Sequence, residues 1–425
     1  MRLSRRLAIL LMLVLAGLCP AFAQDEDAGK SPFQLGFERL AQDAQQRFDV
    51  LCGEAGIPQA VLYYRGASGL MVMGMQHGEI DKQPQSVWPV GSITKTYTAV
   101  LALELQEAGL IELDEPVSSY VPEIDDIFTQ ARLADTSLRT LMHHRSGLPY
   151  QLGDPEDYAP LVPVVRLMLG PQPRLGHDAL LATVANRPLE FEPGQGYLYS
   201  NANFWLAALA MERATGRDYD ELLQEYVLDP IGLDNISLWE VPAGCHAVPA
   251  HITVNGQLLD ITGWDMPGMG RAAGGIRCTG SDLLKFSDAI SGPWRMKQEG
   301  IECATALHGL DIRQDWSIHY ERNGEGFLTA GQLEQLYEFI DTGSTAHSEP
   351  YSYGLGIARR FDGEHWMYGH NGTTPGNRSL WRFDPESGET MIIFSTLGNQ
   401  GLNRIADETL AMLREVEHTD WQEEE

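Results

Sequence analysis

The stretch Val90-Gly91-Ser92-Ile93-Thr94-Lys95-Thr96-Tyr97 constrains this chain more than any other. It places a serine and a lysine three residues apart at the predicted start of a helix, which ends at Ala108-Gly109, where glycine is the usual residue. Residues i and i+3 share one face of a helix, so Ser92 Oγ and Lys95 Nζ can meet. Of the five lysines in the chain, only Lys95 has a serine three positions before it.

This spacing suits nucleophilic catalysis. The helix N-terminus favours an oxyanion at the serine. A lysine buried beside a serine loses stabilisation of its charge, so we expect the pKa of Lys95 to fall and its amine to take the proton of Ser92. The alternative is an ordinary helix start with serine as its cap, and the spacing alone does not separate the two.

The first 23 residues have the pattern of a secretory signal, with arginines, an apolar run from Leu7 to Leu18 and a small-residue cleavage site at Ala21-Phe22-Ala23. We therefore expect cleavage after Ala23 and a secreted or periplasmic protein. No other stretch approaches transmembrane length, so we expect no membrane insertion of the mature form. The net charge of −29 argues against nucleic acid and anionic membranes as partners.

Four cysteines remain after the signal, namely Cys52, Cys245, Cys278 and Cys303. An exported set of this kind permits disulfides, with the connectivity left open. No pair has the short spacing of a zinc site, and the adjacent histidines His143-His144 are expected to point apart. We therefore expect no metal and no cofactor.

Periodicity and turn residues predict the order of elements along the chain. Helices are expected at 33–54, 92–108, 138–144, 201–215, 219–228, 279–290, 330–340 and 403–416, and strands at 60–64, 70–75, 366–370, 379–383 and 390–395. Strands at both ends of a chain commonly form one antiparallel sheet. The predicted fold class is α/β (α+β), with an antiparallel sheet of about five strands flanked by N- and C-terminal helices and a large, mostly helical inserted lobe.

The expected domain boundaries follow from this order. After the signal (1–23), residues 24–30 are expected to be disordered, 31–420 to form one domain and 421–425 to be an acidic tail. Within the domain, 31–90 and 351–420 would build the sheet lobe, and 91–350 the helical lobe. The stretches 151–173 and 291–350 match no motif. A cleft between the lobes is the natural place for a site.

Two further clusters accompany Ser92 and Lys95. In Pro193-Gly194-Gln195-Gly196-Tyr197-Leu198-Tyr199-Ser200-Asn201, Tyr199 and Asn201 could project from a loop into a cleft. A phenol near an ammonium has a lowered pKa and can relay protons, so we expect this of Tyr199. The amide of Asn201 suits a peptide-like substrate. Alone, this cluster would be a helix cap with a core tyrosine.

The third cluster is Tyr368-Gly369-His370-Asn371-Gly372-Thr373-Thr374-Pro375-Gly376, at the end of a predicted strand. Gly372 lets a ligand lie close to the backbone, and an edge strand can pair with an extended substrate. His370 offers a charge that switches near neutral pH. Alone, this cluster would be a glycine-rich hairpin with a solvent-facing histidine.

The three clusters, in this order, resemble the penicillin-recognising serine hydrolases, which include DD-peptidases, class C β-lactamases, D-aminopeptidases and related esterases. The resemblance extends over roughly Pro58 to Leu413 and is supported by 141–149, 273–276 and 353–356. It is strongest to secreted D-alanyl-D-alanine carboxypeptidases, which also carry a histidine in the third motif. Asn371 departs from the small residue usual there, and this bears on substrate preference. A Gly-x-Ser-x-Gly elbow, which the α/β-hydrolase fold would need, is absent from the sequence.

The resemblance implies a role for each motif residue. Ser92 would be the nucleophile, Lys95 and Tyr199 would share the acid and base work, and Asn201 would hold the acyl-side amide. The third motif would bind substrate through His370, Asn371, Gly372 and Thr373. The backbone N–H groups of Ser92 and Thr373 would form the oxyanion hole, at about 3 kcal/mol per donor.

The sequence therefore predicts an exported serine hydrolase that acts through an acyl-enzyme on Ser92. The favoured function is a D-alanyl-D-alanine carboxypeptidase or a related D-amino-acid peptidase, with a small peptide or ester, including a peptidoglycan stem peptide, as its partner. The alternatives are a β-lactamase or carboxylesterase on the same site. From another class, the alternative is a non-catalytic penicillin-binding sensor.

Overall fold

A computed structural model of the chain describes residues 32–66, 72–78, 86–129, 132–150, 176–238, 240–262, 270–291, 326–343, 351–398 and 401–418. Several expectations fall outside these residues: the signal at 1–23, the termini at 24–30 and 421–425, Cys303, the stretch 151–173 and most of 291–350. The architecture below concerns the described part of the chain.

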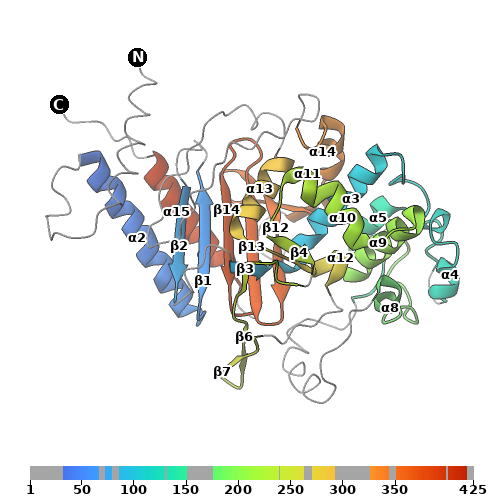
Figure 1. The fold of residues 1–425 in the computed structure, drawn as a ribbon, viewed down its shortest axis with the longest axis horizontal. Coiled ribbons are helices and arrows are strands. Elements are labelled where there is room, and N and C mark those ends of the chain that lie inside the picture. Colours follow the sequence, from blue (N-terminus) through green and yellow to red (C-terminus); the bar gives the residue numbers. More distant parts are fainter. Residues whose placement is uncertain are drawn as a thin grey trace.

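The long helices lie where the periodicity predicts them (Figure 1). Helix α9 ends as expected at Gly216, which has a φ of +67°. Helix α13 is capped by Thr279, whose side chain accepts from Asp282 N. The helices are α2 (Pro32–Glu54), α3 (Thr94–Glu107), α4 (Ile124–Ile127), α5 (Leu138–Met142), α8 (His177–Leu181), α9 (Asn201–Thr215), α10 (Tyr219–Leu223), α11 (Asp229–Ile231), α12 (Arg271–Gly274), α13 (Gly280–Ile290), α14 (Ala330–Leu336) and α15 (Asn403–His418), with the short turns η1 (Gly91–Ile93), η2 (Val117–Ser119) and η3 (Gln224–Leu228).

The main sheet has eight antiparallel strands in the order β2-β1-β14-β13-β12-β11-β10-β9. The five predicted strands are consecutive neighbours in it, which confirms the expected sheet. These are β1 (Ala60–Arg65), β2 (Val72–His77), β12 (Trp366–Thr374), β13 (Asn377–Phe383) and β14 (Thr390–Ser395). The sheet continues through β9 (Ile340–Asp341), β10 (Tyr351–Tyr353) and β11 (Ala358–Phe361), which are too short for a readable alternation. The helix expected at 330–340 ends at Leu336, because the chain turns into β9.

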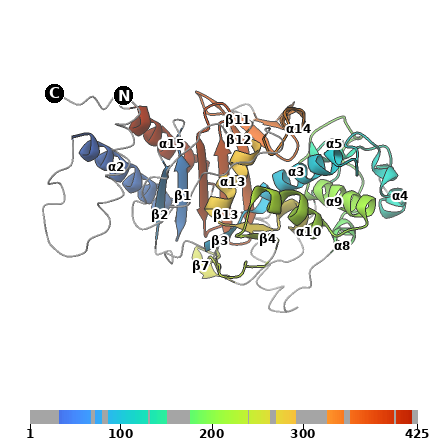
Figure 2. The same ribbon diagram turned by 45° about the horizontal axis from the view of Figure 1, so that its top comes forward.

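Both faces of the central strands are buried, and alternate residues enter different cores. Ala60, Leu62 and Tyr64 of β1 pack in one core with residues of α2 and α15. Val61 packs in the other core, with residues of α3 and α9. Helices α2 and α15 lie side by side over the first face in both ribbon views, while the remaining helices gather beyond the other face (Figures 1 and 2). The sheet is therefore the wall between a helical pair and the helical lobe.

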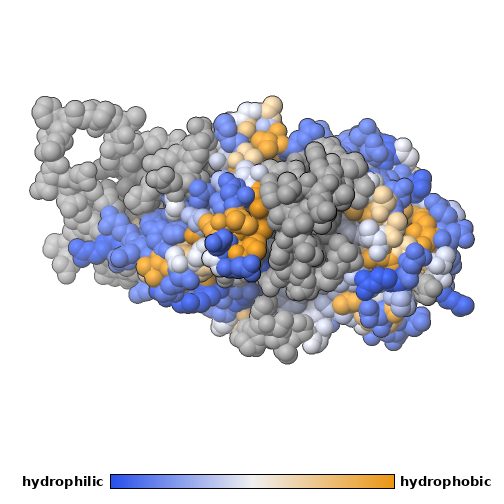
Figure 3. All heavy atoms as spheres, turned by 90° about the horizontal axis from the view of Figure 1, so that it is seen from below, coloured by the Kyte–Doolittle hydropathy of each residue, from blue (hydrophilic) through white to orange (hydrophobic). Residues whose placement is uncertain are grey.

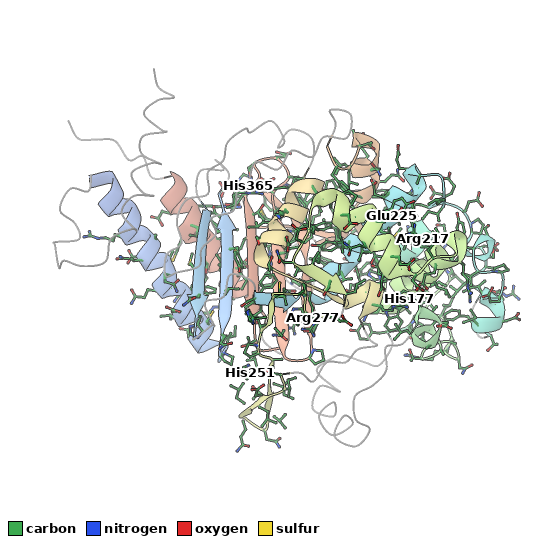
Figure 4. All side chains as sticks on the ribbon, viewed as in Figure 1. His177, Arg217, Glu225, His251, Arg277 and His365 are labelled. Carbon is green, nitrogen blue, oxygen red and sulfur yellow. The ribbon has the colours of Figure 1, made fainter. Side chains whose placement is uncertain are left out.

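A second, smaller sheet and a separate hairpin were not predicted. The small sheet has the order β4-β8-β3-β5, with strands β3 (Ser86–Pro89), β4 (Ile236–Leu238), β5 (His246–Ala247) and β8 (Ile276–Cys278). The hairpin joins β6 (His251–Val254) to β7 (Gln257–Asp260) and projects from the body of the molecule (Figure 1). His251, labelled in Figure 4, ties it to the β12–β13 turn, because its backbone N–H donates to Gly376 O at 3.1 Å.

One face of the molecule shows how polar and apolar residues are distributed over its surface (Figure 3). Seen from below, the described atoms are mostly hydrophilic, with limited apolar patches among them (Figure 3). Among the described helices, none is both long enough and apolar enough to span a bilayer. Cys52, Cys245 and Cys278 are free thiols, so they form no disulfide with one another.

Candidate active site

Ser92 sits in the turn η1, immediately before α3, where strand β12 crosses closely. A Cβ on Gly91, whose φ is +52°, would meet Thr373 N at 2.7 Å. A Cβ on Gly372 would meet Val90 O at 1.9 Å. Glycine is therefore required on both sides of the contact. The approach brings the backbone N–H of Thr373 beside the Ser92 turn, as an oxyanion hole shared between the two would need.

Lys95 is fully buried one helical turn after Ser92. Its Nζ lies 3.0 Å from Ser92 Oγ, 2.7 Å from Asn201 Oδ1 and 2.7 Å from the backbone oxygen of Ala273. Burial lowers the pKa of Lys95 well below its usual value, as the sequence led us to expect. The neutral amine has two N–H groups and one lone pair. The two carbonyl oxygens can only accept, so the lone pair is left for the Ser92 hydroxyl.

Tyr199 joins this pair from the loop before α9. Its hydroxyl is hydrogen-bonded to Ser92, and Lys95 Nζ lies 4.8 Å from the centre of its ring. The expected lowering of its pKa is wrong: burial raises the pKa of Tyr199 well above 10, and the nearby phenols of Tyr351 and Tyr150 act in the same direction. Desolvation outweighs the ammonium because Lys95 itself is driven towards neutrality. Tyr199 therefore keeps its proton and can donate it.

Asn201 begins α9, and the N-cap Ser200 fixes its position by accepting from Ala202 N. Its Oδ1 receives the hydrogen bond from Lys95. The amide Nδ2 is consequently the end that Asn201 can offer to a substrate carbonyl. Ser92, Lys95, Tyr199 and Asn201, four of the residues that the sequence singled out, are thus one connected group.

His370 lies on β12 and is buried and neutral. Its Nδ1 lies 2.6 Å from the carbonyl oxygen of Asn371, so Nδ1 carries the ring proton. Its Nε2 then accepts from the hydroxyl of Tyr353 at 3.0 Å. Burial, followed by the charge of Lys95, lowers the pKa of His370 to about 3. The expected charge switch near neutral pH is therefore wrong.

Asn371 is the one candidate that the structure does not bring to the site. Its side chain is exposed, and its Nδ2 donates to Asn403 Oδ1 at 3.4 Å, on α15. Successive residues of a strand face opposite sides, and His370 faces the helical lobe. Strand β11 pairs with β12 only as far as Gly369, so the backbone of 370–374 pairs with β13 alone among the described strands. The Ser92 turn lies against the face of β12 at Gly372, where an added Cβ would meet Val90 O.

Two residues that the sequence did not single out complete the group. His144 is fully buried, has a φ of +58°, and accepts from Ser200 N at 3.2 Å through Nδ1. Its ring centre lies 4.3 Å from that of Tyr199 and 4.9 Å from that of Tyr353. The Leu141–Pro149 segment, which supported the resemblance, was the available signal for His144. No group of three metal-binding side chains occurs among the residues that the structure describes.

Comparison with known proteins identifies the family of this chain. The family model described as Beta-lactamase matches residues 58–414. Esterase EstB of Burkholderia gladioli is 30% identical over 236 residues, which are 52% of this chain and 57% of EstB. The D-aminopeptidase of Gluconobacter oxydans is 27% identical over 323 residues, 73% of this chain and 50% of that protein. The chain spans about half of the length of the curated relatives that it matches, from 29% to 58%.

The solved structure of a D-stereospecific amidohydrolase from Streptomyces sp. superposes with a TM-score of 0.69 at 23% identity, over 86% of this chain and 96% of that one. At this identity, the similarity establishes the fold. The family model covers most of the chain, and the fold agrees with it. This protein is therefore a member of the beta-lactamase family and has the beta-lactamase fold.

Proposed function

We propose that this protein hydrolyses amides, short peptides or esters of D-amino acids through an acyl-enzyme on Ser92. The observation that carries the proposal is the arrangement around Lys95. The two N–H groups of neutral Lys95 donate to two carbonyl oxygens at 2.7 Å each. Ser92 Oγ lies 3.0 Å from Nζ, so the remaining lone pair of the amine can accept the serine proton. A neutral amine held in this way is a general base for the serine hydroxyl.

The catalytic cycle follows from the contacts. Lys95 takes the proton of Ser92 as Oγ attacks the substrate carbonyl. The backbone N–H groups of Ser92 and Thr373 stabilise the oxyanion. Tyr199 gives its proton to the leaving nitrogen or oxygen, and the proton that Lys95 took from Ser92 then passes to Tyr199. Water then attacks the acyl-enzyme by the reverse proton path, which returns the proton to Ser92 Oγ.

The chemistry of His370 bears on the substrate. A D-alanyl-D-alanine carboxypeptidase must hold a terminal carboxylate, and relatives with lysine in the third motif place a positive charge there. His370 is neutral across the physiological range, because its pKa is about 3. We therefore propose that substrates without a carboxylate on the leaving group are preferred. The names of the relatives, an esterase, a D-aminopeptidase and a D-stereospecific amidohydrolase, support this choice.

The test compares kcat/KM for five substrates: a D-amino-acid amide, its L-enantiomer, a diacyl-D-Ala-D-Ala peptide, a short p-nitrophenyl ester and a cephalosporin. We expect the D-amide to exceed its L-enantiomer and the diacyl peptide. Turnover of the cephalosporin as the fastest substrate would identify a β-lactamase, and turnover of the ester alone an esterase. The fastest turnover of the diacyl peptide would restore the carboxypeptidase function.

A fluorophosphonate probe distinguishes an enzyme from a non-catalytic sensor. We expect one probe mass per chain, located on Ser92 by peptide mapping. Ser92→Ala should abolish labelling, and Ser86→Ala, a partly buried serine in β3, should leave it unchanged. An unlabelled wild-type protein would point to the sensor.

A further inference from the structure

A cluster of aromatic rings extends from Tyr199. We call Tyr197, Tyr351 and Tyr353 the aromatic wall. The ring centre of Tyr353 lies 5.9 Å from that of Tyr197, 6.5 Å from that of Tyr351 and 6.2 Å from that of Tyr199. Tyr353 is fully buried, whereas Tyr197 and Tyr351 are partly exposed. The wall thus has a buried layer that supports two accessible rings.

The wall is held rigidly. The hydroxyls of Tyr197 and Tyr351 are hydrogen-bonded to each other. Tyr353 donates to His370 Nε2 at 3.0 Å. Tyr351 and Tyr353 are two residues apart on β10, whose pairing with β11 fixes both on one face of the sheet. Ordered aromatic rings provide contact area with little loss of conformational entropy on binding.

The wall is also uncharged. Burial raises the pKa of Tyr197, Tyr351 and Tyr353, so all three phenols keep their protons at neutral pH. The buried ring of His370 behind them is neutral as well, with a pKa of about 3. A neutral aromatic surface favours flat apolar groups through burial of area and through ring stacking.

The position of the wall identifies which part of a substrate meets it. The hydroxyl of Tyr199 is hydrogen-bonded to Ser92, and the phenol of Tyr351 is close enough to raise the pKa of Tyr199. Because Tyr199 protonates the leaving atom, the leaving group must extend from the Ser92–Tyr199 contact. Of the wall, Tyr353 contacts Tyr199, with ring centres 6.2 Å apart, and Tyr353 in turn contacts Tyr197 and Tyr351.

We propose that the aromatic wall is the leaving-group subsite and that it takes an uncharged aromatic alcohol or amine. The inference rests on the proposed acyl-enzyme. By microscopic reversibility, the same subsite binds an aromatic acceptor. As the acceptor hydroxyl attacks the acyl carbonyl, its proton passes to Tyr199, which gives its own proton to neutral Lys95. The carbonyl–Ser92 bond then breaks, and the Lys95 ammonium returns that proton to Ser92 Oγ. The products are the aryl ester and the free enzyme.

The experiment measures how one acyl-enzyme partitions between acceptors. The enzyme is acylated with a short p-nitrophenyl ester, and water competes with benzyl alcohol or with cyclohexylmethanol at equal concentration. Both alcohols are neutral and of similar size. The ratio of ester product to acid product is measured with each alcohol, and the difference between the two ratios reports recognition of the aromatic ring. We expect benzyl alcohol to give at least fivefold more transfer, consistent with about 1 kcal/mol of stacking.

Variants of Tyr351 locate the effect. Tyr351→Phe keeps the ring and should retain the benzyl preference, whereas Tyr351→Leu should reduce it to about one. Tyr226→Leu, a partly buried tyrosine of η3, is the matched control and should keep the preference. Equal transfer to both alcohols in the wild type, or an unchanged preference in Tyr351→Leu, would overturn the inference. If Tyr351→Leu fails to fold, the comparison of the two alcohols in the wild type decides the question by itself.

The failure of the inference and that of the proposed function are distinguishable. Intact-protein mass spectrometry after acylation reports the acyl-enzyme directly. An acyl mass on Ser92 without aromatic preference overturns the subsite alone. The absence of any acyl mass on Ser92 overturns the proposed function and the subsite with it.

Discussion

Lys95 Nζ donates to the backbone oxygen of Ala273 at 2.7 Å, so the candidate base is held by a carbonyl from a distant part of the chain. Ala273 belongs to α12, whose first residue, Arg271, lies 3.7 Å from Glu212 and 3.4 Å from Asp220. The two acidic residues belong to α9 and α10. The orientation of the base thus depends on an ion-pair cluster that touches no reacting atom.

Lys95→Arg tests the base directly. Arginine keeps the charge but does not lose a proton, so acylation of Ser92 should fall by several orders of magnitude. The rate of fluorophosphonate labelling measures this, with Lys285→Arg as the control. The wild-type rate should rise with pH through the pKa of Lys95, which burial places well below 10.5. Near-normal labelling of Lys95→Arg would transfer the base role to Tyr199.

Arg271→Ala tests the support of that base. Loss of the ion pairs should loosen α12 and weaken the Ala273 contact, which lowers the acylation rate by about tenfold. A carbonyl acceptor stabilises the ammonium, so its loss should lower the pKa of Lys95 further. The acidic limb of the pH–rate profile should then move to lower pH.

The control for Arg271→Ala is Arg217→Ala, which breaks a surface ion pair with Glu225, both labelled in Figure 4. It should leave the profile unchanged. If the acidic limb of the pH–rate profile lies at the same pH in Arg271→Ala and in the wild type, Arg271 contributes to stability alone.

His370 predicts a pH dependence of folding. Its pKa is about 3 in the folded protein, against an ordinary value of 6.5, so the unfolded chain takes up the proton first as pH falls. This contribution to stability is complete above about pH 6.5 and is lost towards pH 3, at no more than about 1.4 kcal/mol per pH unit. The free energy of unfolding, measured by urea titration at several pH values, should depend less steeply on pH in His370→Gln than in the wild type. The control His246→Gln, at an exposed site, should keep the pH dependence of the wild type.

The same neutrality predicts the substrate profile. Between about pH 5.5 and 9, the ratio of kcat/KM for a carboxylate-terminated peptide to that for its amide should stay flat, because His370 does not titrate there. A charge switch of His370 near neutral pH, as the sequence led us to expect, would instead make this ratio fall as pH rises. A ratio that falls through about pH 6.5 would return a charged role to His370.

Gly372→Ala probes the crossing of β12 and the Ser92 turn. The added Cβ would meet Val90 O at 1.9 Å, so β12 must shift away from Ser92. We expect a loss of stability of about 1–3 kcal/mol and a larger relative loss of acylation. Gly331→Ala in α14, where a Cβ would meet nothing within 4 Å, should be neutral or stabilising. If Gly372→Ala is acylated at the wild-type rate, β12 does not contribute to the oxyanion hole.

The sequence identified the group around Ser92 because its signals are local. Ser92 and Lys95 share a helix face, and Asn201 follows a capping serine. The same reasoning could have excluded Asn371, since strand alternation places it opposite His370. The protonation of Tyr199 and His370 was not predictable, because it depends on burial by residues distant in the chain. His144 and Tyr353 were missed for the same reason: each acts through contacts made only in the fold.

The pairing of β1 with β14 joins Ala60 to Ser395, two residues that are far apart in the sequence. Such a contact closes a very long loop, and long-range pairings of this kind form late. During synthesis, the serine–lysine helix is made long before β12 and β14, which complete the main sheet beside it. The candidate nucleophile therefore gains the Thr373 N–H only after β12 has been made, and a chain cut before β12 carries the serine–lysine motif without that donor.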